Sequence, residues 1–425
     1  MRKLLNEFLL AAFTLALMLF TAKSLEGRIP EGQLSDSLKA PPMQWHKGYG
    51  TDLGEHVHEG MQTSDGGYIG IGQTDEPKEA GFDLLVVKTD PDGELEWQRI
   101  IGRPGRLEVG YCVEEVEDGF LIGGGLWSEG AQRRYLSKLS KKGETRWEHY
   151  YDGPGNDGIR SIDIDGDGTL ITTGYKGAPD GGFIFISMDS EGYIMKTDRD
   201  GNPIWEKKIS PSQGTKVRVD HDQKGYVIVS TINLDGDRDE EVLLLKCDAD
   251  GNEFWSSHYG GKDGEHCYDF DLTNDGGYIC GGHSRSFGVN WDFYLLKINS
   301  EGKEEWYKTF GQPRGYDPQW IHDEAYGVRQ TPDGGYVIVG GTGDEFKYSE
   351  KGHPRGASDI WQVYLVKTNG KGNMEWEGIY GSAYENDAGE YMGLTSDGGV
   401  IIFVDTDSAG DMEPNNFGFM KIGPF

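Results

Sequence analysis

Two short signatures recur along this chain, and they constrain its fold more than any other feature. The signature K-x-[DNS]-x-x-G-x-x-x-W ends six successive segments, at 88–97, 138–147, 196–205, 246–255, 297–306 and 367–376. Trp45 adds a seventh tryptophan in phase, and the intervals between the seven are 52, 50, 58, 50, 51 and 70 residues. Such a period indicates a repeat architecture, in which units that cannot bury a core alone stack on one another.

The second signature, T-x-D-G-G-[YV]-[IV], lies in the middle of each unit. It occurs at 63–69, 273–279, 331–337 and 395–401, with weaker versions in the other units. An Asp-Gly pair between apolar runs predicts a hairpin, because both residues tolerate the positive φ of tight turns. Each unit is therefore predicted as four strands, the first starting at the tryptophan, the second and third flanking the Asp-Gly turn, and the fourth ending at the lysine signature.

Seven units of four short strands predict an all-β fold, a seven-bladed β-propeller with four antiparallel strands per blade. The propeller is expected over residues 45–425, with blades starting near 45, 97, 147, 205, 255, 306 and 376. A β-solenoid is the alternative, although its coils are usually shorter. One closed ring replaces the three domains that a 425-residue chain would otherwise suggest.

The signatures carry a resemblance to known proteins. The lysine–tryptophan segment resembles a one-residue-shorter form of the tryptophan-docking motif of quinoprotein-type propellers, and the Asp-Gly-Gly-Tyr segment resembles repeats of secreted bacterial and archaeal propeller proteins. The resemblance implies the fold, with the tryptophans as packing anchors between blades. It implies no quinone chemistry, because the cofactor and metal ligands of the quinoprotein dehydrogenases have no counterpart that the sequence reveals, and fold alone does not assign function.

The amino-terminal residues predict export. Arg2 and Lys3 precede an apolar run at 8–22, so residues 1–24 are expected to form a signal peptide, with a short membrane anchor as the alternative. Residues 25–44 would form a linker. No second apolar span follows, so we expect a secreted, periplasmic or cell-surface protein with no membrane span after signal removal. We also expect it to be a monomer.

The formal charge of −31 repels nucleic acid and anionic membrane surfaces, so neither is expected as a partner. An anionic ligand would need a local basic site. The four cysteines lie in apolar, strand-like segments, which favours buried thiols over a disulfide framework.

One face of the propeller is the expected functional face. In an antiparallel blade the loops after the first and third strands share a face, and the insertions at 311–323 and 343–359 both fall there. A further insertion, at 187–201, is expected on the opposite face, between the fourth strand of one unit and the tryptophan of the next. Loops that vary on a repeated scaffold usually display binding groups.

Polar side chains gather at the same face. The position five residues before the Thr of the Asp-Gly turn holds no aliphatic residue in any unit, being His58, Tyr111, Arg160, Lys216, Tyr268, Tyr326 and Glu390. The predicted ligand-binding residues are His56, His58, Tyr111, Arg160, Tyr175, Lys216, Asn233 and Glu390. The alternative is that these are ordinary polar strand ends.

Three functions follow as hypotheses. The first is an extracellular propeller that binds a ligand, namely a polysaccharide, on this face through aromatic and arginine side chains. The second is a polysaccharide lyase performing β-elimination on a uronic-acid polymer, as in seven-bladed lyases of marine bacteria, to which the architecture is similar. Elimination needs a base, an acid and a group that stabilises the enolate, and the candidates are His266, Tyr268, His283, Arg285 and Tyr326. The third is a surface scaffold that binds protein.

Two groups of side chains are candidate metal sites. Asp163, Asp165 and Asp167 resemble the start of a calcium loop, but the twelfth position is Tyr175 rather than an acid, and an ordinary hairpin turn is the alternative. A second group, Glu55, His56, His58 and Glu59, offers side chains that suit a transition metal.

Overall fold

A computed structural model describes residues 39–76, 81–178, 190–210, 212–233, 240–311, 313, 321–344, 360–409 and 416–425. Residues 40–425 form one compact unit. The predicted signal peptide and residues 25–38 of the predicted linker lie outside the described residues, whereas Met43 and Gln44 already belong to the first strand. No helix in the described part of the chain is long and apolar enough to cross a membrane.

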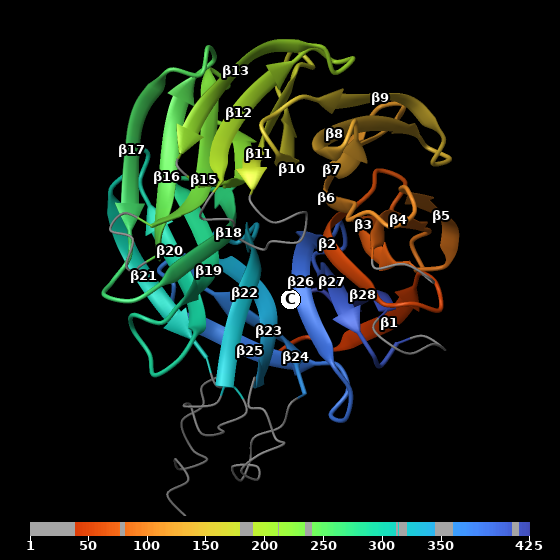
Figure 1. The fold of residues 1–425 in the computed structure, drawn as a ribbon. Helices are drawn as coiled ribbons and strands as arrows, with labels where there is room; N and C mark the ends of the chain where they lie inside the picture. The colour runs from red at the N-terminus through yellow and green to blue at the C-terminus, as the bar shows by residue number, and fades with distance from the viewer. Residues whose placement is uncertain are drawn as a thin grey trace, which may run out of the picture. The chain divides into compact units, whose positions relative to one another are not determined.

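The prediction of a seven-bladed propeller with four antiparallel strands per blade is confirmed (Figure 1). Blade one contains β2 (Glu55–Gln62), β3 (Tyr68–Asp75), β4 (Phe82–Thr89) and β5 (Leu95–Ile101), and blade two contains β6 (Val109–Val116), β7 (Gly119–Ser128), β8 (Ala131–Ser140) and β9 (Thr145–Tyr151). Blade three contains β10 (Asn156–Ile164), β11 (Leu170–Ala178), β12 (Glu191–Thr197) and β13 (Pro203–Ser210), and blade four contains β14 (Gly214–Val219), β15 (Gly225–Asn233), β16 (Glu240–Asp248) and β17 (Glu253–Tyr259).

The remaining blades repeat the pattern. Blade five contains β18 (Glu265–Leu272), β19 (Tyr278–Ser284), β20 (Asp292–Ile298) and β21 (Glu304–Phe310), and blade six contains β22 (Ile321–Gln330), β23 (Tyr336–Asp344), β24 (Gln362–Thr368) and β25 (Met374–Tyr380). Blade seven contains β26 (Asp387–Leu394), β27 (Val400–Thr406), β28 (Asn416–Ile422) and β1 (Met43–Tyr49).

The ring closes by joining the two ends of the propeller. Strand β1 pairs antiparallel with β28, with Trp45 opposite Lys421 and Tyr49 opposite Phe417. The amino-terminal strand therefore supplies the outermost strand of the last blade. The first strand of each blade contacts the first strand of the next around the ring, with β26 returning to β2.

The predicted blade starts are wrong by one strand, because each tryptophan strand ends one blade rather than beginning the next. The tryptophan strand pairs with the strand that carries the preceding lysine signature, as in Lys88 opposite Trp97, so it is the outermost strand of that blade. The signature spans a hairpin within one blade rather than a junction between two. The predicted insertion at 187–201 is corrected as well. Glu191–Thr197 is strand β12, which pairs with β11 and β13, so the extra residues connect β11 to β12 rather than leading into the tryptophan strand.

The two signatures form one structural unit. Asp65 of the Asp-Gly-Gly turn accepts a hydrogen bond from the Thr63 hydroxyl at 2.5 Å. It also forms an ion pair with the buried Lys88 ammonium at 3.1 Å. A Cβ at Gly67 would collide with the Thr89 carbonyl and come 2.7 Å from Lys88 Nζ, which explains the second glycine. The same Asp–Lys pair recurs in blades five, six and seven.

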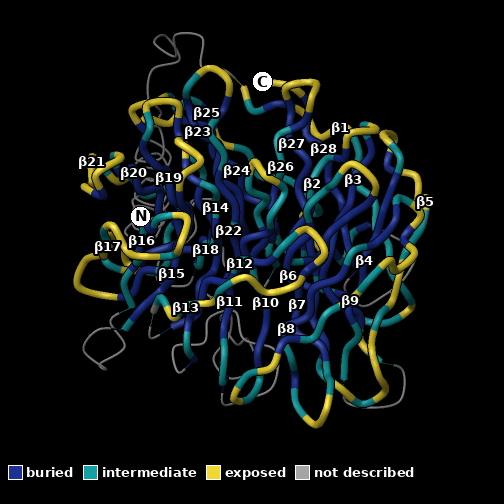
Figure 2. The backbone as a smooth tube through the Cα atoms, turned by 90° about the horizontal axis from the view of Figure 1, so that it is seen from above, coloured by how far each residue is buried: buried dark blue, intermediate teal, exposed yellow. Residues whose placement is uncertain are grey.

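The tryptophans act as packing anchors between blades, as predicted. The ring of Trp97 in blade one lies over Gly143 of blade two, and its indole nitrogen donates to the Lys141 carbonyl at 3.1 Å. Gly143 has φ +75, so the residue that leaves room for the ring also permits the turn. Between these anchors the apolar core lies where neighbouring sheets face each other. Its buried strands are flanked by exposed turns at the ends of the blades (Figure 2).

Candidate functional site

Each innermost strand carries a β-bulge at the same place, and the bulge builds the centre of the site. The skipped residues in the pairing with the second strand are His58, Tyr111, Arg160, Thr215, Tyr268, Tyr326 and Glu390. A bulge adds an unpaired residue and redirects its side chain. All seven side chains line one central cavity, together with Glu59, Lys216 and Tyr391.

Six of these seven residues are the ones predicted from the sequence. In blade four the bulged residue is Thr215, and the predicted Lys216 is the next residue along the strand. Lys216 still lines the cavity, but its buried ammonium pairs with the Glu59 carboxylate and lies over the Tyr391 ring at 4.8 Å. The central cavity measures only about 40 Å³, which is room for water rather than for a sugar ring.

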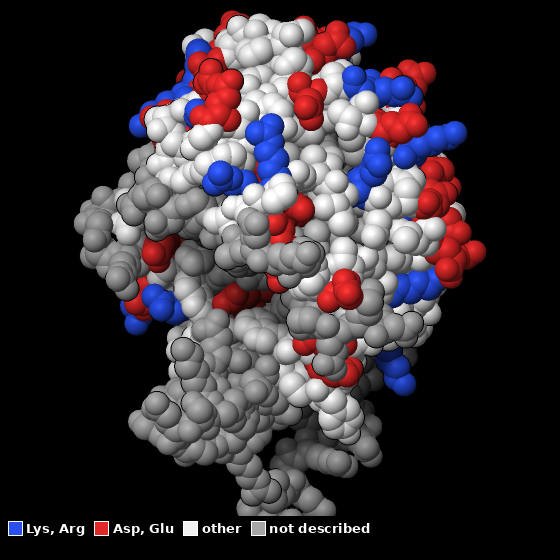
Figure 3. Space-filling model, turned by 45° about the vertical axis from the view of Figure 1, so that its right-hand side comes forward, with Lys and Arg blue, Asp and Glu red and all other residues white. Residues whose placement is uncertain are grey.

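A larger cavity of about 440 Å³ adjoins it between blades six and seven. The two cavities share Tyr326 and Glu390. The larger one is also lined by Glu324, Gly341, Trp361, Asn386, Ala388, Asp405 and Asp407. Its polar lining is therefore mainly carboxylate, and acidic side chains are visible in a hollow of the molecular surface (Figure 3).

An aromatic wall closes one side of the larger cavity. The Trp361 ring packs flat against the β23 backbone, where a Cβ at Gly341 would come 2.7 Å from the ring and one at Gly343 would collide with it. The Trp361 backbone N–H donates to Asn386 Oδ1 at 3.0 Å, which ties this residue's backbone to the residues that precede blade seven. Trp361 is thereby held as a rigid platform beside acceptor groups.

The carboxylates of the cavity differ in their protonation. Burial would raise the pKa of Glu324, but hydrogen bonds from His322 and Tyr326 and the nearby His283 lower it to about 2. The Tyr326 hydroxyl donates to Glu324 Oε2 at 2.7 Å. Burial raises the pKa of Glu390 to about 8, and Asp405 adds to this effect while His56 opposes it. Glu324 is thus ionised at neutral pH and Glu390 is mostly protonated.

Four of the five candidate catalytic residues contact one another. His266 Nδ1 and His283 Nε2 share a hydrogen bond of 3.0 Å. The Tyr326 ring lies 4.9 Å from the Tyr268 ring and 5.9 Å from the His283 ring, measured between centroids. Burial lowers the pKa of His266 to about 3 and lowers that of His283 as well. Both imidazoles are therefore neutral at neutral pH.

Arg285 stands apart from this cluster. Its side chain is exposed and lies over the Trp291 ring at 4.8 Å, at the rim of the face. The Trp291 ring also contacts His266 and His283, at 4.8 and 4.9 Å. Arg285 therefore contacts the cluster through the Trp291 ring, and its charge also lowers the pKa of His266.

Of the other predicted ligand-binding residues, Tyr175 lies deeper, Asn233 lies at the end of a strand and Arg160 lies in the central cavity. Tyr175 is buried and donates to Gln132 at 3.2 Å, beneath Tyr111 rather than in the cavity. Asn233 ends β15, opposite Glu240. Arg160 lies over the Tyr111 ring at 4.6 Å within the central cavity.

The predicted calcium ligands lie apart and serve a hairpin. Asp165 pairs with Lys196 at 3.1 Å, and Asp167 accepts from Thr169 at 2.6 Å. Asp163 accepts from the Val219 backbone of the next blade at 2.6 Å. The three carboxylates do not converge on one point among the described residues.

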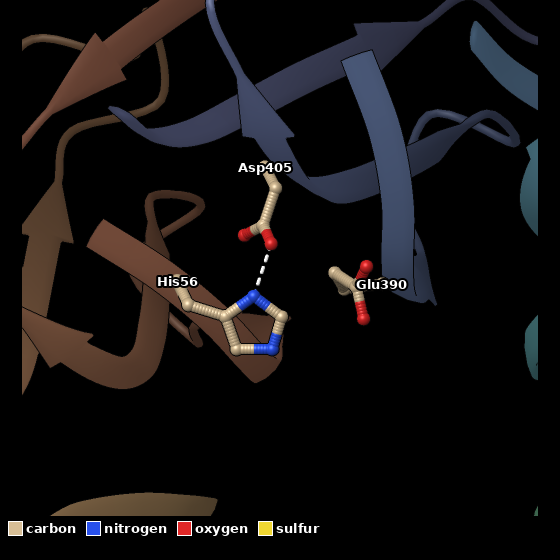
Figure 4. A group of neighbouring side chains, drawn as sticks. All are labelled: His56, Glu390 and Asp405. Carbon is tan, nitrogen blue, oxygen red and sulfur yellow. Dashed lines mark hydrogen bonds and ion pairs between the residues drawn. The ribbon is translucent and has the colours of Figure 1, made fainter. Parts of the chain in front are cut away.

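The second predicted metal group separates in part. The His56 and His58 rings contact each other, with 4.4 Å between their centroids, but the two glutamates have other partners. Glu55 accepts from Thr51 at 2.7 Å, and Glu59 pairs with Lys216. His56 instead faces blade seven, where its Nδ1 hydrogen-bonds to Asp405, and Glu390 lies beside its ring (Figure 4). Burial would lower the pKa of His56, but Asp405 and Glu390 raise it to about 9.

Sequence reasoning missed Asp405, although a signal was present. Asp405 stands ten residues after Thr395, as Gln73 stands after Thr63 and His283 after Thr273. These positions pair with the start of the innermost strand, as in His56 opposite Gln73 and Ala388 opposite Asp405. Trp361 and Asn386 had no such signal, because only the packing of blades six and seven brings them together.

The comparisons with known proteins support the fold and go no further. No family model matches the chain, and no curated protein matches its sequence. The Neurospora crassa Pan2 WD40 domain is similar in structure, with a TM-score of 0.53 and 10% identity over 88% of this chain and 90% of that one. The Kuenenia stuttgartiensis hydrazine synthase has a TM-score of 0.52 and 11% identity, covering 85% of this chain and 97% of that one.

A puromycin hydrolase is also similar, with a TM-score of 0.51 and 12% identity. The match covers 84% of this chain but 51% of the hydrolase. At these identities a shared propeller fold carries no shared activity. The chain is thus a seven-bladed β-propeller whose site must be interpreted from its own residues.

Proposed function

We propose that this protein binds a polysaccharide in the cavity between blades six and seven. The observation that carries the proposal is the meeting of Trp361 and Tyr326 with several carboxylates and an amide in one cavity of about 440 Å³. Sugar rings present apolar faces and many hydroxyl groups. A fixed indole stacks on the faces, and carboxylate oxygens accept hydrogen bonds from the hydroxyls.

The charge of the cavity favours a neutral sugar over an acidic one. Glu324 is ionised, and Asp405 and Asp407 stand at the same wall. A uronate carboxylate would meet like charges there, at a cost that grows in a partly buried site. The signal peptide expected at residues 1–24 would bring the protein to the compartment where such polymers occur.

A glycan array probed with the full-length protein tests this proposal. We expect binding to neutral polysaccharides, and we expect Trp361→Ala to weaken it by about tenfold or more, since loss of a stacking platform removes about 1–2 kcal/mol. The matched control is Phe254→Ala, because Phe254 is 63% exposed and lies outside the cavity. Equal binding by the wild type and Trp361→Ala, with both folded by circular dichroism, would place any glycan elsewhere.

A polysaccharide lyase is the second candidate, favoured by the contacts among His266, Tyr268, His283 and Tyr326. A neutral imidazole would remove the proton next to the uronate carboxylate, the electrons would form the carbon–carbon double bond, and a tyrosine hydroxyl would protonate the departing oxygen. The unsaturated product absorbs in the ultraviolet. No absorbance change with several uronate polymers, or full activity in His283→Ala, would exclude this candidate.

A protein-binding scaffold is the least supported of the three functions. Such a role needs no convergent polar centre, whereas the described structure gathers seven bulged side chains around one cavity. Binding of no glycan, with capture of a defined protein partner that is lost on changing the exposed loops, would favour it.

A further inference from the structure

The seam where the ring closes brings together three side chains that suit a metal ion. His56 lies on β2 in blade one, whereas Glu390 and Asp405 lie on β26 and β27 in blade seven. Each offers one nitrogen or oxygen atom, and these three atoms lie within 4.8 Å of one another (Figure 4). Among the described residues, this is the group of three or more His, Cys, Asp or Glu side chains whose ligand atoms all lie this close together.

Glu390 supplies an independent observation that points to a ligand. Its side chain is only 9% exposed, and no hydrogen bond or ion pair joins its carboxyl group to another described residue. The carboxyl group instead lines both cavities, so a ligand that enters either cavity can reach its oxygens. Since Glu390 is the bulged residue of β26, the fold itself directs this group toward the centre.

We propose that His56, Glu390 and Asp405 form a binding site for a divalent transition-metal ion, Zn²⁺ or Mn²⁺. One imidazole and two carboxylates form a mixed nitrogen and oxygen donor set, which suits these ions better than Ca²⁺, whose ligands are all oxygens. Asp405 either ligates the ion or holds the His56 ring by its hydrogen bond, since metal-binding histidines commonly donate their other N–H to a carboxylate.

The ion would face the larger cavity, because Glu390 and Asp405 both line it. Three protein ligands leave a coordination position for water or for a ligand oxygen. The proposal goes beyond glycan binding, and neither depends on the other. Glycan binding that persists after metal removal would leave the proposed function intact.

Isothermal titration of the full-length protein, first dialysed against a chelator, tests the site. We expect one equivalent of Zn²⁺ or Mn²⁺ to bind, with Ca²⁺ much weaker. We expect Glu390→Gln and Asp405→Asn to lose about tenfold or more in affinity, because each keeps its shape and loses a carboxyl group that can bind the ion as an anion. The matched control is Glu324→Gln, which removes an acid from the same cavity but outside the proposed site.

Each outcome decides the question. No binding of either ion by the wild type overturns the proposal, as does unchanged affinity in both variants. Equal losses in Glu324→Gln would show general attraction by an acidic cavity rather than a built site. His258→Gln guards against an adventitious surface site, because His258 is exposed and pairs with Glu241. Circular dichroism of each variant shows whether it is folded, and metal analysis of the purified wild type gives a second readout.

Discussion

The tryptophan anchors between blades make a strong test of how the repeat stabilises the ring, and we consider Gly302→Ala. Gly302 lies in a turn of blade five with φ +78, and a Cβ there would come 2.7 Å from the Trp255 ring of blade four. The left-handed backbone costs a non-glycine residue about 1–2 kcal/mol. Forcing the ring away adds about 1–3 kcal/mol of overpacking. We therefore expect a loss of about 2–5 kcal/mol in the free energy of unfolding.

Gly276→Ala is the matched control. Gly276 has φ +86, but no atom lies within 4 Å of a Cβ at that position. Gly276→Ala therefore has the unfavourable backbone conformation but no steric contact. Alanine restricts the unfolded chain equally in both variants. Urea unfolding followed by far-ultraviolet circular dichroism should place Gly302→Ala about 1–3 kcal/mol below Gly276→Ala. In a Trp255→Ala background the two substitutions should cost the same. Equal losses in the wild-type background would refute the anchoring argument.

Three other predictions follow from the same contacts. The pKa of His266 is about 3 in the fold and about 6.5 in the unfolded chain, so between these pH values only the unfolded chain binds the proton. This residue should therefore lower the free energy of unfolding by about 1.4 kcal/mol for each pH unit below pH 6.5. Urea titrations at several pH values should show that His266→Gln removes this contribution to the pH dependence. Lys297→Met should lower the free energy of unfolding by about 1–3 kcal/mol, because it leaves the Ile298 carbonyl and Asp275 without their buried donor. A variant as stable as the wild type in urea unfolding would contradict this. Deleting residues 39–49 removes the β1 strand from blade seven and should lower the melting temperature sharply in calorimetry, whereas an unchanged melting temperature would show that β1 does not close the ring.

The fold could be predicted because the repeat is local. A lysine, a turn and a tryptophan within ten residues mark a hairpin, and seven copies fix the number of blades. The phase of the blades could not be predicted in the same way. The signature shows which strands are joined by a turn, but only hydrogen bonding shows that Lys88 and Trp97 share a sheet. A motif that looks like the end of one unit was in fact the outer edge of a blade.

The site was predictable wherever counting along the strand was reliable. Counting back from the turn found the bulged residue in six blades and missed by one in blade four. There the Asp220 N–H bonds to the Gly225 carbonyl, whereas the Thr63 N–H bonds to the Gly67 carbonyl, so the loop is one residue longer. Gln223 takes a positive φ of 53 to accommodate it. Groups that meet across blades, such as Trp361 and Asn386, carry no such pattern.

The central cations bear on which ligand the face can bind. Lys216 is one of the predicted ligand-binding residues, but its ammonium already pairs with Glu59. Arg329 lies two residues further from the bulge than Lys216, on the innermost strand of blade six, where it pairs with Asp269 and donates to the Tyr391 hydroxyl. A buried cation that is paired and hydrogen-bonded gives little to an incoming charge, because the ligand would have to displace the partner and leave it unpaired.

A uronate polymer would therefore rely on Arg160, which lies in the small central cavity, and on Arg285 at the rim. The larger cavity between blades six and seven, which has room for a sugar ring, lies instead beside Glu324, Asp405 and Asp407. Volume and positive charge are thus in different places on this face. Since a ligand must fit before its charge matters, the described residues favour a neutral, hydroxyl-rich polymer, and a lyase would have to bind its substrate outside the larger cavity.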